Sequence, residues 1–285
     1  MRLTLVANPG SGRDTDPDVL ADALRERGAE VDAYPIDAVE EAGRAAAGSD
    51  RLVVAGGDGS IGVAARAATA AGIPLAVIAS GTANDFARAL DLPQDHDRAV
   101  DLAADPAAAT THIELLIAGE DRPFVNAAST GLAVAAAHRA RPLKSKLGPL
   151  AYAVGGLRAG LTAHPLALRV IADGEEVFRG DAWHVIVGGT GAFGGGSRLG
   201  RTDHSDEMLD VVLVERGSRA ALVLRAWGMR RGTLEEQRGV HHARAHRVEI
   251  EVPEGTEFNI DGEICDLRPT TFGVQPGGVK VIIPR

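Results

Sequence analysis

The chain has 285 residues, of which 45% are hydrophobic and 24% are charged, an ordinary balance for a folded protein and a length that suits two domains. The formal net charge of −9 argues against a broad nucleic-acid-binding surface, because a polyphosphate would be repelled overall. No apolar run approaches the ~20 residues that span a bilayer, and a lone Cys265 excludes an intrachain disulfide, so we expect a cytoplasmic protein without a transmembrane segment.

The first hundred residues alternate between apolar strand segments and helical segments. Strands are predicted at 3–9 (LTLVANP), 30–36 (EVDAYPI), 51–57 (RLVVAGG) and 74–81 (PLAVIASG), and helices at 17–27, 39–47, 61–71 and 83–90. The first run has the character of a strand and lacks that of a secretory signal. Near-continuous apolar strands separated by helices favour a parallel sheet with both faces covered. Ligands of such sheets bind at the carboxyl ends of the strands, where Asn8, Gly56 and Ser80 are expected.

After about Pro106 short strand segments predominate. They are predicted at 112–119, 122–129, 166–173, 175–180, 183–189, 209–215, 247–252, 257–262 and 278–284. Turns such as ADGEE and PEGTE suit antiparallel hairpins, and two helical stretches lie near 147–162 and 219–230. We therefore predict an α/β domain with a parallel sheet over residues 1–108 and a β-rich domain over residues 109–285.

The stretch Gly56-Gly57-Asp58-Gly59-Ser60 follows a buried strand and precedes a helix. Such a turn offers free backbone N–H groups and the positive end of a helix dipole, which suits phosphate. A carboxylate beside phosphates is repulsive unless it binds Mg²⁺ or accepts a proton from a nucleophile. The alternative is that Asp58 is simply the N-cap of the helix that follows.

Two further strand ends have a similar composition. SGTANDFAR at 80–88 again combines a glycine, hydroxyl groups and a helix start, although Thr82 or Asn84 could serve only as a cap. NPGSGR at 8–13 adds Arg13, which a turn does not need and a triphosphate would use. Three such loops at neighbouring strand ends favour a shared phosphate site over three unrelated turns.

Several motifs follow one another along nearly the whole chain. They are NPGSGR (8–13), GGDGS (56–60), GTANDFAR (81–88), FVNAASTG (124–131), KSKLGPLAYAVGGLRA (144–159), FGGGSRLGRTDHSDEMLD (193–210) and NIDGE (259–263). In this order and spacing the sequence resembles the diacylglycerol kinase catalytic-domain family, which includes bacterial lipid kinases and the sphingosine and ceramide kinases. GGDGS alone also resembles the nucleotide loop of NAD kinases and phosphofructokinases, whereas GTANDFAR and the closing DGE are more specific.

The resemblance implies an N-terminal nucleotide-binding domain like that of NAD and diacylglycerol kinases, and a C-terminal antiparallel β-sandwich. ATP and Mg²⁺ would bind in the cleft between the two domains. The positions that match the nucleotide motifs are Asn8, Ser11, Gly12, Arg13, Gly56, Gly57, Asp58, Gly59, Ser60, Gly81, Thr82, Asn84 and Asp85. By the same resemblance Asp58 would also help to bind the catalytic Mg²⁺ through water, or would act directly on the acceptor hydroxyl.

The segment FNIDGEI carries two carboxylates, Asp261 and Glu263. Residues two apart on a strand share one face, so both side chains are expected to point the same way. An alcohol that attacks phosphorus must lose its proton, and a carboxylate is a suitable acceptor. Without the resemblance this segment is most simply a hairpin turn. With it, we favour Glu263 as the base and Asp261 as its partner, although the sequence does not rank them.

A second metal site is implied by the resemblance alone. Several related bacterial kinases hold a structural Mg²⁺ through an Asp and neighbouring backbone carbonyls, and Asp206 and the carbonyl of Met208 match those positions. Oxygen ligands of this kind suit Mg²⁺. The alternative is a solvated loop, and Glu207 stands where the family usually has glycine.

Two basic segments allow alternative interpretations. His242 and His246 have the i, i+4 spacing of a metal site on a helix, but they precede an apparent strand without an obvious carboxylate partner, which favours a solvated basic loop. The basic residues between 139 and 158 could form a solvated face or contact anionic lipid headgroups, and the leucines among them could be core or an apolar lip for acyl chains. These basic residues are Arg139, Arg141, Lys144, Lys146 and Arg158.

Together these features favour an ATP- and Mg²⁺-dependent kinase of a lipid hydroxyl, with diacylglycerol as the first expected substrate and phosphatidic acid as the product. Such an enzyme would be cytoplasmic and would contact the inner face of the membrane peripherally. The alternatives are a kinase of a non-lipid alcohol such as NAD or a sugar phosphate, and a nucleotide-binding regulatory protein. The sequence leaves the oligomeric state open, a homodimer included.

Overall fold

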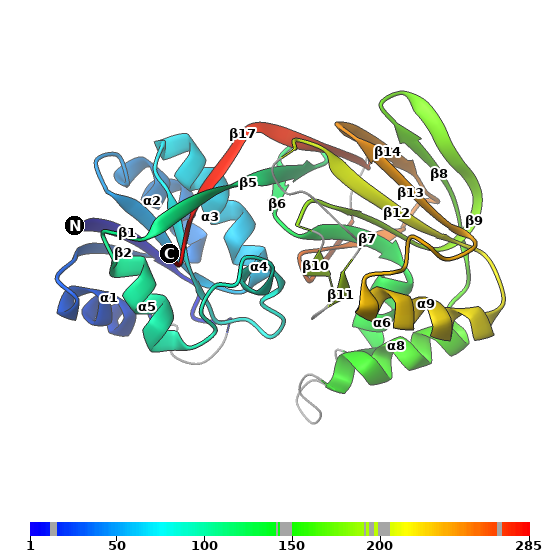
Figure 1. The fold of residues 1–285 in the computed structure, drawn as a ribbon, viewed down its shortest axis with the longest axis horizontal. Helices are drawn as coiled ribbons and strands as arrows, with labels where there is room; N and C mark the ends of the chain where they lie inside the picture. Colours follow the sequence, from blue (N-terminus) through cyan, green and yellow to red (C-terminus); the bar gives the residue numbers. More distant parts are fainter. Residues whose placement is uncertain are drawn as a thin grey trace. The chain divides into compact units, whose positions relative to one another are not determined.

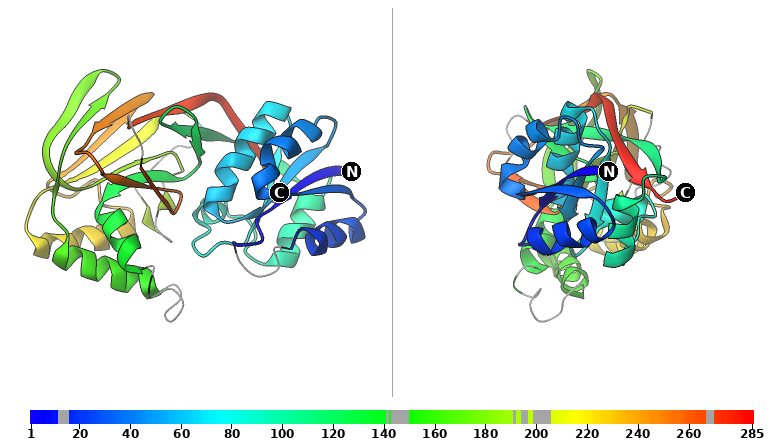
Figure 2. Two further views of the ribbon diagram at one scale, coloured as in Figure 1. Left: turned by 180° about the vertical axis from the view of Figure 1, so that it is seen from behind. Right: turned by 90° about the vertical axis from the view of Figure 1, so that its left-hand side faces the viewer.

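The computed structural model describes residues 1–11, 16–140, 142, 150–190, 192–193, 197–198, 206–266 and 270–285. They form two compact units. Unit 1 comprises Met1–Leu115, Pro123–Val125 and Gln275–Arg285, and unit 2 comprises Leu116–Arg122 and Asn126–Val274. Both termini therefore belong to unit 1 (Figures 1 and 2).

These boundaries differ from the division into 1–108 and 109–285. The last strand, β17 (Thr271–Ile283), returns to the first unit, where Val281 pairs in parallel with Leu75 of β4 (Leu75–Ala79). This pairing joins positions about two hundred residues apart, and no local pattern in the sequence encodes it.

The parallel sheet of unit 1 has the order β2-β1-β3-β4. Its other strands are β1 (Arg2–Ala7), β2 (Glu30–Pro35) and β3 (Arg51–Gly56), and its helices are α1 (Pro17–Glu26), η1 (Ile36–Ala38), α2 (Val39–Ala45), α3 (Asp58–Ala71), α4 (Asp85–Ala89) and α5 (His96–Ala104). The four strands and the first four α-helices were all predicted, and the expectation of a parallel α/β unit is confirmed.

Both faces of this sheet are covered. Leu5 of β1 packs in a cluster with Leu20 and Leu24 of α1 and with residues of α5, whereas the adjacent Val6 packs in a second cluster with Ile61 of α3 and residues of α2. Alternate side chains of one strand point to opposite faces. Strands that bury both faces must be apolar throughout, which explains the uninterrupted apolar runs of the sequence.

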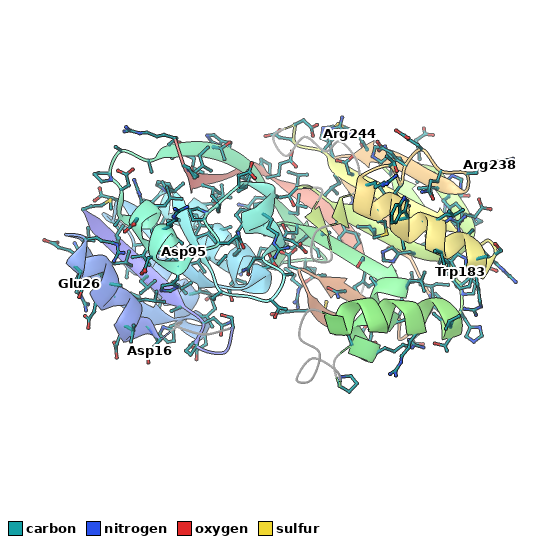
Figure 3. The ribbon with its side chains drawn as sticks, turned by 60° about the horizontal axis from the view of Figure 1, so that its bottom comes forward. Asp16, Glu26, Asp95, Trp183, Arg238 and Arg244 are labelled. Atoms are coloured by element: carbon teal, nitrogen blue, oxygen red, sulfur yellow. The ribbon has the colours of Figure 1, made fainter. Side chains whose placement is uncertain are left out.

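The helix α5 was missed by the sequence analysis. Asp95 is its N-cap, and its carboxylate accepts the N–H of Arg98 at 3.1 Å (Figure 3 labels Asp95). An Asp followed by an amphipathic segment is a typical helix start, so the sequence did contain a signal for this helix. The buried Ala99, Val100 and Ala103 contribute to the core beside α1.

Unit 2 is built mainly of antiparallel strands. They are β7 (Ala127–Gly131), β8 (Leu166–Ala172), β9 (Glu175–Gly188), β10 (Ala192–Phe193), β11 (Ser197–Arg198), β12 (Leu209–Glu215), β13 (Val240–Ala245), β14 (Arg247–Glu251), β15 (Glu257–Ile260) and β16 (Glu263–Asp266). The strands β5 (Ala109–Ala118), β6 (Arg122–Phe124) and β17 each contribute residues to both units. The expectation of an antiparallel, sandwich-like C-terminal domain is confirmed.

One strand of unit 2 was predicted as two, and the predicted strand 122–129 is divided between β6 and β7. The strands β10, β11, β13 and β16 were not predicted. Segments 175–180 and 183–189 form the single strand β9, because Gly180 and Ala182 remain paired with β8. The first half of β9 pairs with β8, and its second half pairs with both β7 and β12. The missed strand β13 is polar and pairs with β12, so its partner rather than its own sequence makes it a strand.

The helices of unit 2 described here are α6 (Leu132–Ala140), α8 (Leu150–Thr162) and α9 (Arg219–Arg231), and α6 was not predicted. The helices α6 and α8 pack closely at Gly155, where a Cβ atom would lie 2.5 Å from the carbonyl oxygen of Ala136. In the part of the chain that the structure describes, no helix combines the length and apolarity needed to cross a bilayer.

Candidate functional site

The carboxyl ends of β1, β3 and β4 bring together four polar side chains of unit 1, here called the strand-end cluster: Asn8, Ser11, Ser60 and Ser80. The Nδ2 group of Asn8 donates to Oγ of Ser60 at 3.0 Å, and the Oγ atoms of Ser11 and Ser80 lie 3.2 Å apart. Segments 52 and 69 residues apart in the chain are thus directly hydrogen-bonded. The cluster lies where the sequence predicted a phosphate site, and its hydroxyl groups are suitable donors to anionic oxygens.

The glycines of these loops permit close contact between the loops themselves. A Cβ atom on Gly81 would lie 2.7 Å from Cα of Gly57, and one on Gly56 would lie 2.6 Å from Cβ of Ser60. Real Cβ atoms do not approach other atoms so closely, so these positions require glycine. The close contact at Gly81 is between the two loops, whereas the one at Gly56 is within a single loop.

Asp58 connects the two loops through its carboxylate. It is the first residue of α3, whose N-cap is Gly57, so the alternative that Asp58 caps its own helix is wrong. Instead Oδ1 accepts the N–H of Phe86 at 3.0 Å and Oδ2 accepts the N–H of Asp85 at 3.2 Å, at the start of α4. The carboxylate therefore satisfies two backbone donors of another helix and fixes the two loops to each other.

Asn84 has an unusual backbone conformation and an unsatisfied side-chain oxygen. Its φ of 50° lies in the left-handed region, which asparagine tolerates better than most residues. Its Oδ1 atom is buried and accepts no hydrogen bond from the described residues. A buried acceptor without a donor costs about 1–3 kcal/mol, so a ligand or water that donates here would relieve a real penalty. This fits the predicted role of Asn84 in nucleotide binding.

The remaining predicted nucleotide residues are less informative. Gly59 lies in the first turn of α3, Thr82 is exposed, and Asp85 is buried at the start of α4. Gly12 and Arg13 lie outside the described residues. The interaction of Arg13 with phosphate therefore stays a prediction.

In unit 2, Asp261 and Gly262 form the two-residue turn between β15 and β16. Their φ angles are 45° and 90°, as in a type I′ hairpin turn, and Ile260 pairs with Glu263 across it. Asp261 is thus not a strand residue, so the argument that strand alternation aligns Asp261 with Glu263 is wrong. Its Oδ1 atom accepts the N–H groups of Asn126 at 3.0 Å and Ala127 at 3.1 Å.

Glu263 lies on the strand side of the same turn and is accessible. Its side chain is 63% exposed, and Oε2 accepts Nη2 of Arg122 at 2.7 Å. Arg122, the first residue of β6, was not among the predicted site residues, because it meets Glu263 only through the fold. The turn therefore presents one carboxylate held by backbone N–H groups and another paired with an arginine.

In the segment predicted to hold a structural Mg²⁺, Asp206 lies beside an arginine of the same unit. Asp206 forms an ion pair with Arg244 of β13, and the N–H of Met208 donates to its Oδ1 at 3.1 Å. The guanidinium supplies positive charge to Asp206, and the structural Mg²⁺ site at Asp206 and Met208 stays a prediction. No three His, Cys, Asp or Glu side chains among the described residues are placed to hold a metal. Glu207, at a position where the resembling family has glycine, has a φ of 60°.

His241 and His242 lie on the strand β13, and His246 follows directly after it. His242 lies on β13, and its Nε2 is 2.8 Å from Oδ1 of the buried Asp210. This hydrogen bond, together with the negative charges of Asp210 and Glu235, raises the pKa of His242. His241 and His246 also face carboxylates, those of Glu215 and Asp173. The helical metal-site interpretation is therefore wrong.

The basic segment between 139 and 158 is only partly described. Arg139 donates to the carbonyl of Ala135 and to Oγ1 of Thr162, so it joins α6 to α8, and Arg158 is exposed on α8. Arg141, Lys144 and Lys146 lie outside the described residues. The contact of this segment with lipid headgroups stays a prediction.

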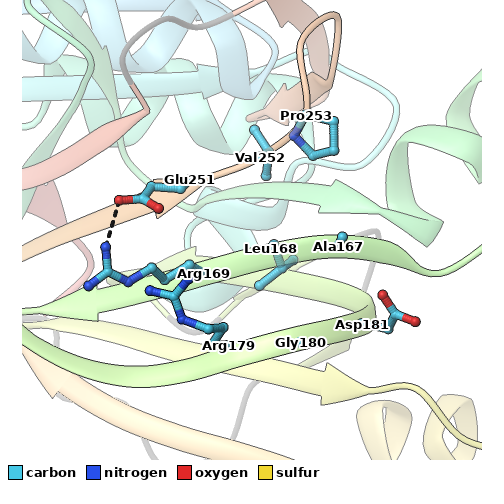
Figure 4. Close-up of a pocket in the computed structure, with 9 residues that line it drawn as sticks. All are labelled: Ala167, Leu168, Arg169, Arg179, Gly180, Asp181, Glu251, Val252 and Pro253. Carbon is cyan, nitrogen blue, oxygen red and sulfur yellow. Dashed lines mark hydrogen bonds and ion pairs between the residues drawn. The ribbon is translucent and has the colours of Figure 1, made fainter.

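A surface pocket of about 350 Å³ lies on unit 2 near β8 and β9 (Figure 4). None of the predicted site residues lines it. Arg169 is paired with Glu251 at 2.9 Å and with Glu176 at 2.5 Å, and Arg179 is also paired with Glu176. Hydrogen bonds from the two arginines lower the pKa of Glu176 to about 2. Since these charges compensate one another, the strand-end cluster and the Asp261 turn remain the stronger candidates.

Comparison with known proteins finds matches over both parts of the chain. Residues 2–115 match the diacylglycerol kinase catalytic domain, and residues 126–283 match the YegS C-terminal NAD kinase beta sandwich-like domain. The chain is 30% identical over 301 residues to the diacylglycerol kinase of Staphylococcus saprophyticus, covering 99% of this chain and 95% of the relative.

Two solved structures share the fold. The crystal structure of a diacylglycerol kinase from Bacillus anthracis has a TM-score of 0.77 and 22% identity, covering 99% of this chain and 96% of that one. An NAD kinase from Archaeoglobus fulgidus in complex with ATP has a TM-score of 0.53 and 13% identity, covering 100% of this chain and 94% of that one.

Proposed function

Because the chain belongs to the diacylglycerol kinase family, in which a catalytic domain precedes a YegS-type sandwich domain, we propose that it is an ATP- and Mg²⁺-dependent lipid kinase that converts diacylglycerol to phosphatidic acid. The observation that carries the proposal is the attachment of Asp58 to the N–H groups of Asp85 and Phe86 beside the strand-end cluster. The enzyme would act as a cytoplasmic protein at the inner face of the membrane.

ATP would bind at the strand-end cluster. The hydroxyl groups of Ser11, Ser60 and Ser80 would donate to phosphate oxygens, and the buried Oδ1 of Asn84 would accept a hydrogen bond from the nucleotide or its water. Mg²⁺ would offset the charge of the phosphates during transfer. Asp58 would help to bind Mg²⁺ through water, with its carboxylate held in place by the N–H groups of Asp85 and Phe86.

The Asp261 turn would act on the acceptor alcohol. The hydroxyl oxygen attacks the γ-phosphorus, the bond between that phosphorus and the ADP oxygen breaks, and the hydroxyl proton passes to a carboxylate. We assign this proton to Glu263, whose exposed side chain can reach a substrate, and we assign the orientation of the turn to Asp261. Arg122 would limit the motion of Glu263 before the substrate binds.

Transfer of label from ATP identifies the acceptor class. The purified protein is incubated with labelled ATP and Mg²⁺, and with diacylglycerol in mixed micelles, NAD or sugar phosphates in parallel reactions. We expect labelled phosphatidic acid and no labelled product from the water-soluble alcohols. NAD is the informative competitor, because the fold is shared with an NAD kinase. Transfer to NAD without transfer to any lipid would overturn the proposal.

A further inference from the structure

The helix α9 exposes an unusual group of apolar side chains. Val223, Leu224 and Trp227 are 68%, 67% and 59% exposed, and they are three of the five large hydrophobic side chains that are more than half exposed in the described part of the chain. A fourth, Leu161, lies at the end of α8. Exposed apolar residues are normal when scattered, whereas a group within five positions of one helix indicates a contact surface.

The opposite face of α9 attaches the helix firmly to unit 2. Leu222 and Met229 pack against the cluster around Trp183, which Figure 3 labels beside the helix. The guanidinium of Arg219 donates to the carbonyls of Gly160 at 2.8 Å and Ala163 at 2.7 Å, next to the end of α8. The exposed apolar side chains therefore belong to a helix whose opposite face is already packed against unit 2.

The charge of α9 is opposite to that of the whole protein. The helix contains four arginines (Arg219, Arg225, Arg230 and Arg231) and no acidic residue, in a chain with a net charge of −9. Arg231 lies one and two turns beyond Trp227 and Val223, on the same face, and its guanidinium is 4.4 Å from the centre of the Trp227 ring. Tryptophan beside arginine is typical of side chains that sit at the headgroup level of a membrane.

We propose that the α9 surface, defined by Val223, Leu224, Trp227 and Arg231, binds the surface of an anionic bilayer and inserts its three apolar side chains among the headgroups. The inference deepens the proposed function, on which it rests for the presence of a membrane-bound substrate. Apolar insertion and attraction of arginine to anionic lipid act together at such a surface. A second copy of the chain is a poorer occupant, because a two-fold contact would bring Arg231 of both copies to one surface, with no acidic residue of α9 to pair with them.

Tryptophan fluorescence tests the proposal directly, because the chain has two tryptophans and they differ in exposure. Trp183 is 4% exposed and Trp227 is 59% exposed, so a change on binding vesicles reports Trp227. With vesicles of equal parts phosphatidylglycerol and phosphatidylcholine we expect a blue shift of the emission and quenching by brominated lipid. Vesicles of phosphatidylcholine alone should give a much smaller change, and Trp227→Phe should abolish the change with either vesicle.

Matched variants distinguish binding through the α9 surface from nonspecific binding through any exposed apolar side chain. The double variant Val223→Ser with Leu224→Ser should weaken sedimentation with anionic vesicles by about tenfold or more, since two partly inserted aliphatic side chains are lost. Val19→Ser on α1, which changes a side chain that is also 59% exposed, should stay within about twofold of the wild type. Arg231→Gln should reduce the preference for anionic over neutral vesicles.

The outcomes distinguish this inference from the proposed function. Unchanged Trp227 emission with anionic vesicles would overturn the inference, even if the protein phosphorylates short-chain diacylglycerol in detergent. Vesicle binding that depends on Val223 and Leu224 would support it, even if no lipid is phosphorylated. If size-exclusion chromatography shows a dimer that the double variant dissociates, and vesicles leave Trp227 unaffected, the occupant is a second copy and the proposal is wrong.

Discussion

The carboxylate of Asp58 accepts the backbone N–H of Phe86 at 3.0 Å, although Asp58 opens α3 and Phe86 lies in α4. The backbone N–H of Asp85 donates a second hydrogen bond to the same carboxylate, so two bonds join Asp58 to the start of α4. A negative charge at the start of a helix is favourable, because it faces free N–H groups and the positive end of the helix dipole. Asp58 therefore fixes the relative position of the two glycine loops before any ligand binds.

Replacement of Asp58 by asparagine tests this link. The amide of Asp58→Asn has one acceptor oxygen in place of two, so one backbone donor is left unsatisfied and the free energy of unfolding should fall by about 1–3 kcal/mol. We also expect kcat to fall by roughly a hundredfold or more, since the carboxylate charge is lost. Urea unfolding and steady-state kinetics measure the two effects. Asp97→Asn, which alters an exposed side chain, is the control, and a normal kcat in Asp58→Asn would refute the assigned role.

Contact between the glycine loops predicts the cost of adding a methyl group. Gly81→Ala would place a Cβ atom 2.7 Å from Cα of Gly57, and we expect a loss of stability of about 1–3 kcal/mol together with weaker ATP binding. Gly156→Ala on α8 adds the same methyl group where no atom lies within 4 Å. This control should raise stability by about 0.5–1 kcal/mol, because alanine favours the helix. Equal stabilities for the two variants would contradict the close contact.

The two carboxylates of the turn should respond differently to neutralisation. Glu263→Gln changes an exposed side chain and should leave the thermal midpoint nearly unchanged while kcat falls by about 10²–10⁴-fold. Asp261→Asn weakens the bonds to Asn126 and Ala127 and should lower both the thermal midpoint and kcat. Arg122→Gln removes only the partner of Glu263 and should retain substantial activity. If Glu263→Gln retained full activity, the base would be another group.

Burial of His184 predicts a loss of stability in acid. Desolvation lowers the pKa of His184 to about 4 from an ordinary value near 6.5, while its Nδ1 atom is 2.8 Å from the carbonyl of Thr130. The unfolded chain therefore takes up a proton below pH ~6.5 that the folded chain refuses until pH ~4, so stability falls as the pH drops through this window, by up to about 3 kcal/mol. Urea unfolding at several pH values measures the slope. His184→Gln should flatten it, and an unchanged slope in that variant would assign the acid sensitivity to other groups.

Removal of metal tests the ion pair between Asp206 and Arg244. If Arg244 supplies the positive charge in this segment, EDTA or Mg²⁺ should not change the thermal midpoint of the nucleotide-free wild type. Arg244→Ala leaves Asp206 and the buried Asp210 without this cation, so the midpoint should fall and partial recovery with Mg²⁺ is expected. Calorimetry in EDTA and in Mg²⁺ compares the two proteins. If the wild type loses stability in EDTA, that result would support the structural Mg²⁺ site predicted at Asp206.

Local patterns in the sequence determined much of unit 1. Each strand buries both faces, so its apolar run is continuous, and each strand end carries its glycines and hydroxyls within a few residues of the run. Because parallel strands all end at one edge of the sheet, the approximate positions of Asn8, Asp58 and Ser80 followed from the sequence alone.

Tertiary structure decided what these residues contact. Asp58 could have capped its own helix as readily as α4, and only the packing of Gly57 against Gly81 brings the donors of α4 within reach. Arg122 pairs with Glu263 although they are 141 positions apart in the chain. Arg244 reaches Asp206 from β13, a polar segment that is a strand because it pairs with β12. The sequence alone determines the chemistry of each side chain and its neighbours along the chain. Its partner in the fold depends on which distant backbone segments pair, and only the folding of the whole chain decides that pairing.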